Sequence, residues 1–227
     1  MTVRSKWALS KAEAPGRPGV PDAVFPCRPI FCEAPAAPAR RCHEEEIMER
    51  SEKILRGLGN QYYRATLKSM GFTTEDLKRP VIGIANAWSE CVPGHYNLRQ
   101  VAQRVKDGIY RAGGTPIEFG VIGGCDGMGQ GHDGMHYILP SRELIANSIE
   151  SMAQINLFDG LVLLGSCDKI VPGMLMAAAR LDIPCIFLPG GPMEGGVEFD
   201  GRQSDQTSST EAYGMLSAGK ITEAEYV

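Results

Sequence analysis

Cys167, Asp168 and Lys169 are consecutive, so a soft thiol, a hard carboxylate and an amine stand side by side in this 227-residue chain. They follow the apolar run 161–164, which is typical of a buried strand. Thiolates bind soft metals, whereas carboxylates bind hard divalent ions. This triplet is the richest chemical motif of the sequence.

Two further segments repeat the arrangement of an apolar run followed by metal-ligating side chains. Cys125 and Asp126 follow the run 119–122, and Cys91 follows the run 81–85. Ligands of a parallel α/β sheet bind outside the carboxyl ends of its strands. We therefore expect these loops to meet at one rim and to form a site with both a soft and a hard metal centre.

The cysteines also have other interpretations. Buried cysteines are common in α/β cores and are often inert, and Cys185, inside the run 183–188, is interpreted in this way. Cys167 differs because it lies past a strand end beside two ionisable residues. A nucleophilic cysteine needs an imidazole or a helix N-terminus nearby. The sequence alone assigns this partnership to none of the candidates, which are His95, His132 and His136.

The carboxylates suggest a hard metal ion. Asp126 and Asp168 together would be suitable oxygen ligands for a divalent cation. Lys169 would be repelled from such an ion as an ammonium group, so it must turn away or be chemically neutralised. His95 is equally compatible with a functional role and with capping a loop.

Apolar spacing around these motifs predicts alternating strands and helices. Ser141 is a plausible N-cap, and Pro172 is expected to open a helix. This order implies right-handed βαβ units, and therefore an α/β fold with a mostly parallel sheet and helices on both faces. The expected strands are 81–85, 115–122, 160–165 and 183–188, and the expected helices are 97–112, 141–155 and 173–181.

Composition narrows the function classes. A net charge of −4 argues against a nucleic-acid binder, which usually carries a basic patch. No apolar run approaches the roughly 20 residues that cross a bilayer, so we expect no membrane span. The seven cysteines are odd in number and have no repeating spacing. Free thiols or metal ligands in a reducing cytoplasm are therefore expected rather than disulfides.

The two ends of the chain differ from its middle. Residues 1–45 are rich in proline, alanine and arginine and show no apolar periodicity, so we expect a disordered tail ahead of an α/β domain at 46–227. Three tail cysteines and His43 match no standard zinc spacing. The segment 223–227 resembles the first turn of a helix, and a helix of one turn is not stable alone. We therefore expect the domain to be incomplete at its C-terminus.

A glycine-rich segment, 129–134, supplies a different hypothesis. It matches the dinucleotide-binding pattern GxGxxG, which would make the chain a nucleotide-binding α/β module. That pattern must begin at a strand end, so that backbone N–H groups meet the pyrophosphate. Here several residues intervene, and Asp126 and Asp133 would repel a diphosphate. A flexible loop without a ligand is the simpler alternative.

From about residue 51 onward the chain resembles the N-terminal part of the dihydroxy-acid dehydratase and sugar-acid dehydratase family. Several uncommon strings occur in the family's order and spacing. They are 92–95 (VPGH), 125–128 (CDGM), 141–146 (SRELIA), 167–174 (CDKIVPGM) and 190–193 (GGPM).

The resemblance implies an enzyme that removes water from a 2,3-dihydroxy carboxylate to give a 2-keto acid, with an iron–sulfur cluster (2Fe-2S or 4Fe-4S) and Mg²⁺ as cofactors. It implies that Cys167 ligates the cluster and that Asp126 and Asp168 ligate Mg²⁺. Lys169 would be the family's carbamylated lysine, whose carbamate is an anionic oxygen ligand. The full-length enzyme is expected to be a homo-oligomer that acts on a small molecule.

This chain departs from the family pattern in its first loop. Many members have a cysteine where this chain has Gly94, and Cys91, three residues earlier, is a second candidate cluster ligand. The family's other cluster cysteine and a glutamate ligand of Mg²⁺ would lie beyond Val227, so we expect the chain alone to be inactive. The activity that the resemblance favours is dihydroxy-acid dehydration in branched-chain amino-acid synthesis. The alternative within the family is a sugar-acid (aldonate) dehydratase.

Overall fold

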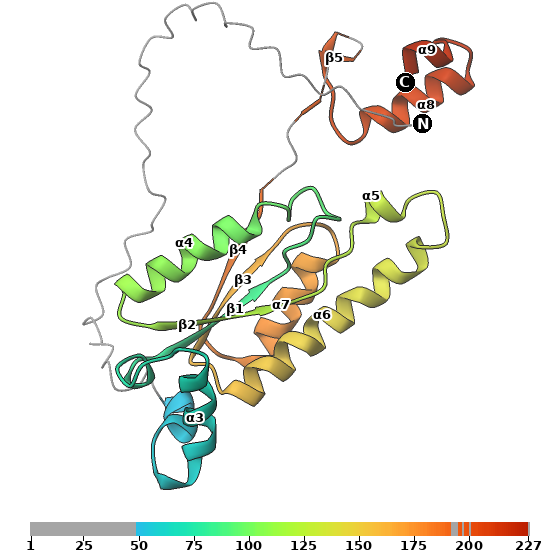
Figure 1. Ribbon diagram of the computed structural model, residues 1–227. Helices are drawn as coiled ribbons and strands as arrows, with labels where there is room; N and C mark the ends of the chain where they lie inside the picture. The colour runs from blue at the N-terminus through green and yellow to red at the C-terminus, as the bar shows by residue number, and fades with distance from the viewer. Residues whose placement is uncertain (1–48, 192–194, 197, 200, 227) are drawn as a thin grey trace, which may run out of the picture. The chain divides into compact units, whose positions relative to one another are not determined.

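The computed structural model describes residues 49–226 apart from 192–194, 197 and 200 (Figure 1). The expected tail at 1–45 lies outside the described residues. The strands are β1 (Val81–Asn86), β2 (Thr115–Gly120), β3 (Gly160–Gly165), β4 (Cys185–Pro189), β5 (Glu198–Phe199) and β6 (Arg202–Gln203). The helices are α2 (Glu49–Leu55), α3 (Gln61–Ser69), α4 (Leu98–Arg111), α5 (Asp126–Gly129), α6 (Met135–Asn156), α7 (Ile170–Leu181), α8 (Ser208–Ser217) and α9 (Glu223–Tyr226), with short 3-10 turns η1 (Leu58–Asn60) and η2 (Asp76–Lys78).

The four longer strands form one parallel sheet in the order β2-β1-β3-β4. This confirms the α/β fold with a mostly parallel sheet. The chain winds from β1 to β2 on one side and then crosses back to β3 on the other side of β1. Ligands of such sheets bind at the carboxyl ends of the strands where the winding direction changes. In this protein that point lies between β1 and β3.

Helices cover both faces of the sheet, with α4 on one face and α6 and α7 on the other (Figure 1). The strand β3 shows why both faces are covered, because all six of its residues are buried. Leu161 and Leu163 join the core cluster that contains residues of α6 and α7, whereas Val162 and Leu164 join the cluster that contains residues of α4. Successive side chains of a strand point to opposite faces, so this uninterrupted apolar run fills two cores.

Two helices begin earlier than the sequence analysis predicted. The helix α6 begins at Met135, and Ser141 is not its N-cap but lies inside it, where its hydroxyl donates to the Ile138 carbonyl at 2.6 Å. Pro140 also lies within α6, ahead of the predicted start of that helix. The helix α7 begins at Ile170, ahead of Pro172. Pro172 lies in the first turn of α7, where a proline removes only an N–H group that has no partner within the helix.

A buried carboxylate organises the amino end of the sheet. Asp159, which is 4% exposed, lies just before β3. Its Oδ1 accepts the backbone N–H of Ser51 at 3.0 Å, and its Oδ2 accepts that of Val81 at 2.7 Å. One side chain thereby ties α2 and the start of β1 to the start of β3. Nothing in the local sequence marked this aspartate.

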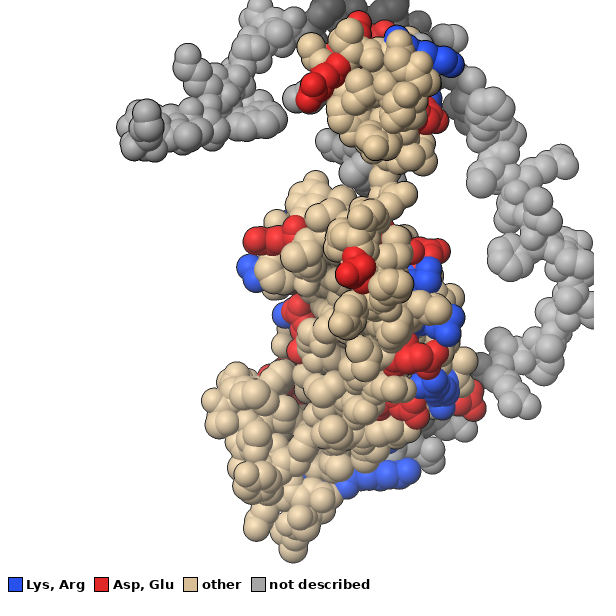
Figure 2. Space-filling view, turned by 90° about the vertical axis from the view of Figure 1, so that its right-hand side faces the viewer, with Lys and Arg blue, Asp and Glu red and all other residues tan. Residues whose placement is uncertain are grey.

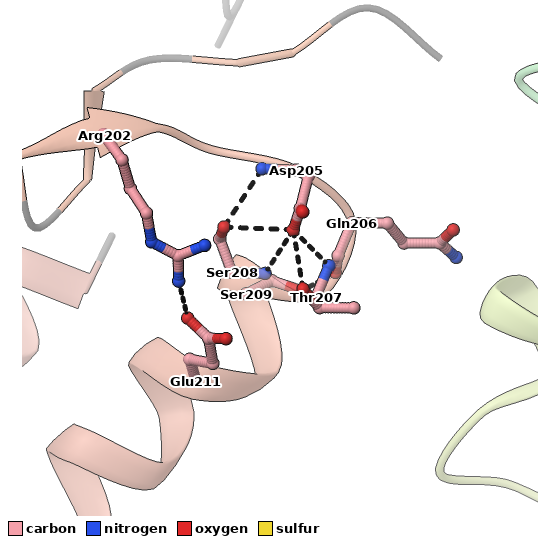
Figure 3. A network of polar contacts seen from close by, with 7 residues as sticks. All are labelled: Arg202, Asp205, Gln206, Thr207, Ser208, Ser209 and Glu211. Atoms are coloured by element: carbon pink, nitrogen blue, oxygen red, sulfur yellow. Dashed lines mark hydrogen bonds and ion pairs between the residues drawn. The ribbon is translucent and has the colours of Figure 1, made fainter. Parts of the chain in front are cut away.

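The polar segment before α8 is a helix start (Figure 3). Asp205 Oδ1 accepts the hydroxyl of Thr207 at 2.7 Å and the backbone N–H groups of Thr207 and Ser208 at 2.9 and 3.1 Å. These hydrogen bonds, that of the Thr207 hydroxyl first, lower the pKa of the Asp205 carboxyl. Arg202 and Glu211 form an ion pair beside this network. The expected helix start near the C-terminus is also present, as α9.

The interpretation of Cys185 as a buried structural cysteine is wrong. Cys185 is exposed, because β4 is the outermost strand and pairs with β3 alone in the sheet. The apolar run 183–188 predicted burial on both faces, but the residues Ile186 and Leu188 are also exposed in the described structure. A sequence run does not reveal whether a strand is central or at an edge.

The surface of the described residues is mixed in charge. Figure 2 shows a face on which acidic and basic side chains are intermixed and uncharged residues cover most of the area. Among the described residues, no helix combines the length and the apolar character needed to span a bilayer.

Candidate functional site

The loops that follow β1, β2 and β3 meet at the carboxyl edge of the sheet, as the sequence predicted. The register aligns Asn86 with Gly120 on one side and with Leu164 on the other. Backbone bonds continue past the strand ends, from the Ala87 N–H to the Leu164 carbonyl at 3.0 Å and from the Val121 N–H to the Asn86 carbonyl at 2.9 Å. The three loops therefore start from one fixed platform.

The backbone of Cys167 is strained. Its φ is +77°, in the left-handed region that favours glycine. For other residues this conformation costs about 1–2 kcal/mol, and it persists only where the surroundings enforce it. The N–H of the preceding Ser166 donates to His95 Nε2 at 2.8 Å, and Ser166 Oγ accepts the Gly190 N–H at 3.0 Å. Neighbouring loops thus hold the turn that presents Cys167.

His95 has a positioning role in this structure, as one of its two interpretations suggested. It is fully buried, and its Nε2 accepts a backbone N–H from the loop after β3. Burial lowers the pKa of the imidazole, although backbone groups of Ser166 and Ala87 partly oppose this effect. The neutral ring therefore joins the first loop to the third, next to Cys167. It reaches Ser166 and not the thiol.

Close packing of glycines brings the loop after β1 against the loop after β4. A Cβ on Gly190 would lie 2.0 Å from the Gly94 carbonyl oxygen. Because that oxygen belongs to the backbone, a side-chain rotation could not relieve the clash. A Cβ on Gly94 would lie 3.0 Å from both the Ser166 Cβ and the Gly191 oxygen. The position that carries a cysteine in many family members therefore has almost no free space in this chain.

The two carboxylates predicted as metal ligands are brought together by Lys169. Its ammonium lies 3.2 Å from Asp126 Oδ2 and also pairs with Asp168 Oδ2. These carboxylates, that of Asp168 first, raise the pKa of Lys169, and Lys169 lowers the pKa of Asp168. The second oxygen of Asp126, Oδ1, is buried and has no hydrogen-bond partner among the described residues. A buried oxygen without a partner is costly unless a ligand completes it.

Two of the cysteines line one small cavity. Cys125 and Cys167 border a space of about 120 Å³, together with Gly94 and Ser166. Burial raises the pKa of the Cys167 thiol, and the neighbouring Cys125 side chain raises it further. Cys91, the other predicted cluster ligand, is exposed and does not line this cavity. The sequence placed Cys125 among the metal-ligating side chains of this rim but did not name it as a cluster ligand, although it precedes Asp126 as Cys167 precedes Asp168.

A larger cavity of about 360 Å³ lies near the ends of β1 and β2, but its charged side chains already have partners. Its carboxylate, Glu118, is already bound by Lys106 and by Asn86 Nδ2. Its cation, Arg99, lies over the Trp88 ring at 3.4 Å from the ring centre. The smaller cavity is lined by two cysteines, each followed in the sequence by an aspartate that pairs with Lys169, and is therefore the candidate site.

The glycine-rich segment does not have the geometry of a dinucleotide site. It begins at the last residue of α5 and not at the end of β2, from which it is separated by residues 121–128. The Gly134 N–H donates to His132 Nδ1 at 3.0 Å, so an amide that would meet a phosphate is already occupied. The structure gives the nucleotide-binding hypothesis no support.

In the described part of the chain, no three His, Cys, Asp or Glu side chains lie close enough to hold a metal ion by themselves. The four candidates instead form two pairs. Cys125 and Cys167 line the cavity, while the carboxylates of Asp126 and Asp168 pair with Lys169. A hard-metal site would therefore need Lys169 itself, or further ligands, to complete it.

Fold and site together define an α/β protein whose sheet edge presents paired thiols and paired carboxylates. The chain belongs to the family described as dihydroxy-acid/6-phosphogluconate dehydratase N-terminal, whose pattern it matches over residues 79–227. It is 55% identical over 177 residues to the dihydroxy-acid dehydratase of Caldanaerobacter subterraneus subsp. tengcongensis, and 53% identical over 176 residues to that of Pyrococcus abyssi. Each match covers 78% of this chain and 32% of the relative.

A similar protein from Clostridium pasteurianum, also named dihydroxy-acid dehydratase, is 51% identical over 176 residues, which are 61% of its length. The chain thus spans about a third of the length of the first two relatives. The family resemblance predicted from the sequence is confirmed.

Proposed function

We propose that this chain provides the N-terminal α/β part of an iron–sulfur and Mg²⁺-dependent hydro-lyase, which converts a 2,3-dihydroxy carboxylate to a 2-keto acid. The observation that carries the proposal is the meeting of two Cys-Asp pairs from separate strand ends, with Lys169 between their carboxylates. The shared name of the relatives, dihydroxy-acid dehydratase, supports this choice of reaction.

The carboxylate pair fits a hard divalent ion. Asp126 Oδ1 is buried without a partner among the described residues, and carboxylate oxygens are the ligands that Mg²⁺ prefers. Carbamylation of Lys169 by CO₂ would release two protons and replace a cation with an anion. Binding of one Mg²⁺ would then restore the net charge of these three side chains. Asp126, Asp168 and the carbamate of Lys169 would hold the ion in the place where the ammonium now neutralises the two carboxylates.

The thiols fit a soft centre. Cys167 reaches the cavity from a strained turn, which two neighbouring loops hold through Ser166. A preorganised ligand loses little freedom on binding, because its geometry is already set. Cys167 would therefore be a ligand of the cluster, with its sulfur on the side of the cavity and the Asp168 carboxylate on the side of Lys169.

The reaction needs assistance at both carbons. The C2 proton and the C3 hydroxide leave as water, and the enol that remains rearranges to the 2-keto acid. When bound, the cluster would supply a Lewis acid for the poor hydroxide leaving group, and Mg²⁺ would stabilise the enolate and hold the carboxylate. In this proposal the chain positions the two metal centres. The hydrogen bond between the Ser166 N–H and His95 fixes the turn that presents Cys167.

The substrate distinguishes this proposal from its alternative, an aldonate dehydratase. The relatives' names favour a dihydroxy acid, and we propose one of branched-chain amino-acid synthesis. A homo-oligomeric state and a cytoplasmic location belong to the same proposal and remain predictions.

A chimera tests the proposal directly. Residues 79–227 would replace the segment that they match in the Caldanaerobacter dehydratase, and the product would be reconstituted anaerobically with ferrous iron, sulfide and Mg²⁺. We expect release of 2-keto acid from a branched dihydroxy acid, measured as its hydrazone, at a rate within about tenfold of the parent. Faster turnover of an aldonate would favour the alternative. A folded, metal-loaded chimera that dehydrates neither substrate would contradict the proposal.

A further inference from the structure

We propose that Cys125 is the second thiolate ligand of the soft metal centre, beside Cys167, and that Cys91 is not a ligand. The proposal rests on the proposed function, because it names a ligand of the same centre. It chooses a different residue from Cys91, the second candidate that the sequence offered.

The placement of Cys125 is the first argument. It is buried, 9% exposed, and lines the same cavity of about 120 Å³ as Cys167. The two residues come from loops after different strands, β2 and β3, yet they line one cavity. Two sulfurs that share one small cavity form the kind of donor pair that soft metals select.

The first loop supplies the second argument, because it brings backbone rather than sulfur to the cavity. Gly94 lines the cavity, and its neighbours leave almost no space for a side chain. Cys91 is exposed, and its backbone N–H donates to Ser89 Oγ at 2.9 Å within a local turn. A thiol in that turn would have to leave the surface to reach Cys167.

The order of residues within each loop is the third argument. Cys125 immediately precedes Asp126, and Cys167 immediately precedes Asp168. In both pairs the cysteine lines the cavity and the carboxylate pairs with Lys169. The two loops therefore make equivalent contributions, one sulfur and one carboxylate each, to adjacent soft and hard centres.

Two versions of the 227-residue chain test the assignment with Cd²⁺, a soft ion whose thiolate bonds absorb in the ultraviolet. One version keeps Cys125 and Cys167 and has serine at the other five cysteines. The matched version keeps Cys91 and Cys167, so both contain two thiols. Excess Mg²⁺ would occupy the carboxylates, and far-UV circular dichroism would verify folding.

We expect the chain with Cys125 and Cys167 to bind one Cd²⁺ at least tenfold more tightly than the matched chain, with about twice the thiolate absorbance. The ¹¹³Cd NMR shift of this complex should indicate two sulfur ligands. That version keeps the buried Cys125, and Cys91 and Cys185 are exposed in the native chain, so its folding is not at risk from a core substitution.

Two other results would overturn the inference in distinguishable ways. Equal or tighter binding by the chain with Cys91 and Cys167 would remove Cys125 as a ligand and leave the proposed function intact. A folded chain with Cys125 and Cys167 that shows no two-sulfur ¹¹³Cd signal would also overturn the inference. In that case, loss of the iron–sulfur absorbance of the chimera in Cys167→Ser would still support the proposed function.

Discussion

Two aspartates at opposite ends of the same sheet differ in how their oxygens are used. At the amino end, both oxygens of Asp159 accept backbone N–H groups, from Ser51 and Val81. At the carboxyl end, one oxygen of Asp126 faces Lys169, and the other is buried without a partner among the described residues. The first carboxylate is complete within the fold, whereas the second is not.

This difference separates structural from functional polar groups. A buried polar group that the fold satisfies stabilises the native state, and its loss leaves its partners unpaired. A buried polar group that the fold leaves unsatisfied carries a cost, which is expected where a ligand will bind. We therefore expect changes at the amino end to affect stability, and changes at the carboxyl end to affect metal binding.

The largest effect on stability should come from Asp159→Ala. The substitution leaves the N–H groups of Ser51 and Val81 without a partner, and each hydrogen bond to a charged group contributes about 1.5–3 kcal/mol. We expect the free energy of unfolding to fall by about 3 kcal/mol, measured by urea denaturation. Asp133→Ala, at an exposed position, is the control and should change it by less than about 0.5 kcal/mol. Equal effects of the two substitutions would refute the structural role of Asp159.

Gly190→Ala should have the next largest effect, because its Cβ would lie 2.0 Å from the Gly94 oxygen. Overpacking of this kind costs about 1–3 kcal/mol, and here it would also separate the loops that border the cavity. Gly108→Ala in α4 is the matched control, since a Cβ there would have no neighbouring atom within 4 Å. The control should gain up to about 1 kcal/mol in urea unfolding. Similar results for both glycines would argue against the close approach of the loops.

His95 should make stability depend on pH. Burial lowers its pKa in the folded chain below the ordinary value of about 6.5, so the unfolded chain takes up a proton first on acidification. Its contribution is complete above about pH 6.5 and is lost as the pH falls from there through the lowered pKa of the folded state. The urea midpoint should therefore fall over this range, and His95→Gln should reduce that dependence. If the exposed His132, changed to Gln, reduces it equally, the assignment to His95 is wrong.

The smallest effect on stability should come from Asp126→Asn. The substitution keeps the shape of the side chain, and Lys169 keeps its pair with Asp168. We expect a change of less than about 1 kcal/mol in urea unfolding, because pairs that are partly exposed contribute little. Binding of Mn²⁺ in place of Mg²⁺, followed by electron paramagnetic resonance in the chimera, should nevertheless weaken by at least tenfold. A loss of stability like that of Asp159→Ala would remove the contrast between the two ends.

The sequence predicted the platform of the site well, because short-range patterns determine it. The apolar runs indicated the strands of the sheet, and the parallel order then placed Asp126 and Cys167 at one edge. Thiol and carboxylate side chains directly follow these apolar runs, so the candidate ligands could be identified from the sequence alone.

Other features depend on contacts between distant residues and could not be predicted. The exposure of Cys185 follows from the edge position of β4, which no local pattern encodes. The bond from the Ser166 N–H to His95 and the shared cavity of Cys125 and Cys167 join different loops. Cys91 was the more obvious substitute for the cysteine missing at Gly94, because it is close in sequence, but Cys125 is close in space.

The most direct test of the central claim, that one sheet edge holds separate soft and hard centres, is to remove each centre in the chimera and measure both. Cys167→Ser should abolish the iron–sulfur absorbance and leave Mn²⁺ binding within about twofold of the parent, because thiolates and carboxylates select different metals. Asp168→Asn should keep the absorbance and lose Mn²⁺ binding, and Lys169→Arg should do the same, since arginine carries a permanent charge. Loss of both signals in the folded Cys167→Ser chimera would contradict the claim, and so would full retention of both signals in Cys167→Ser and in Asp168→Asn.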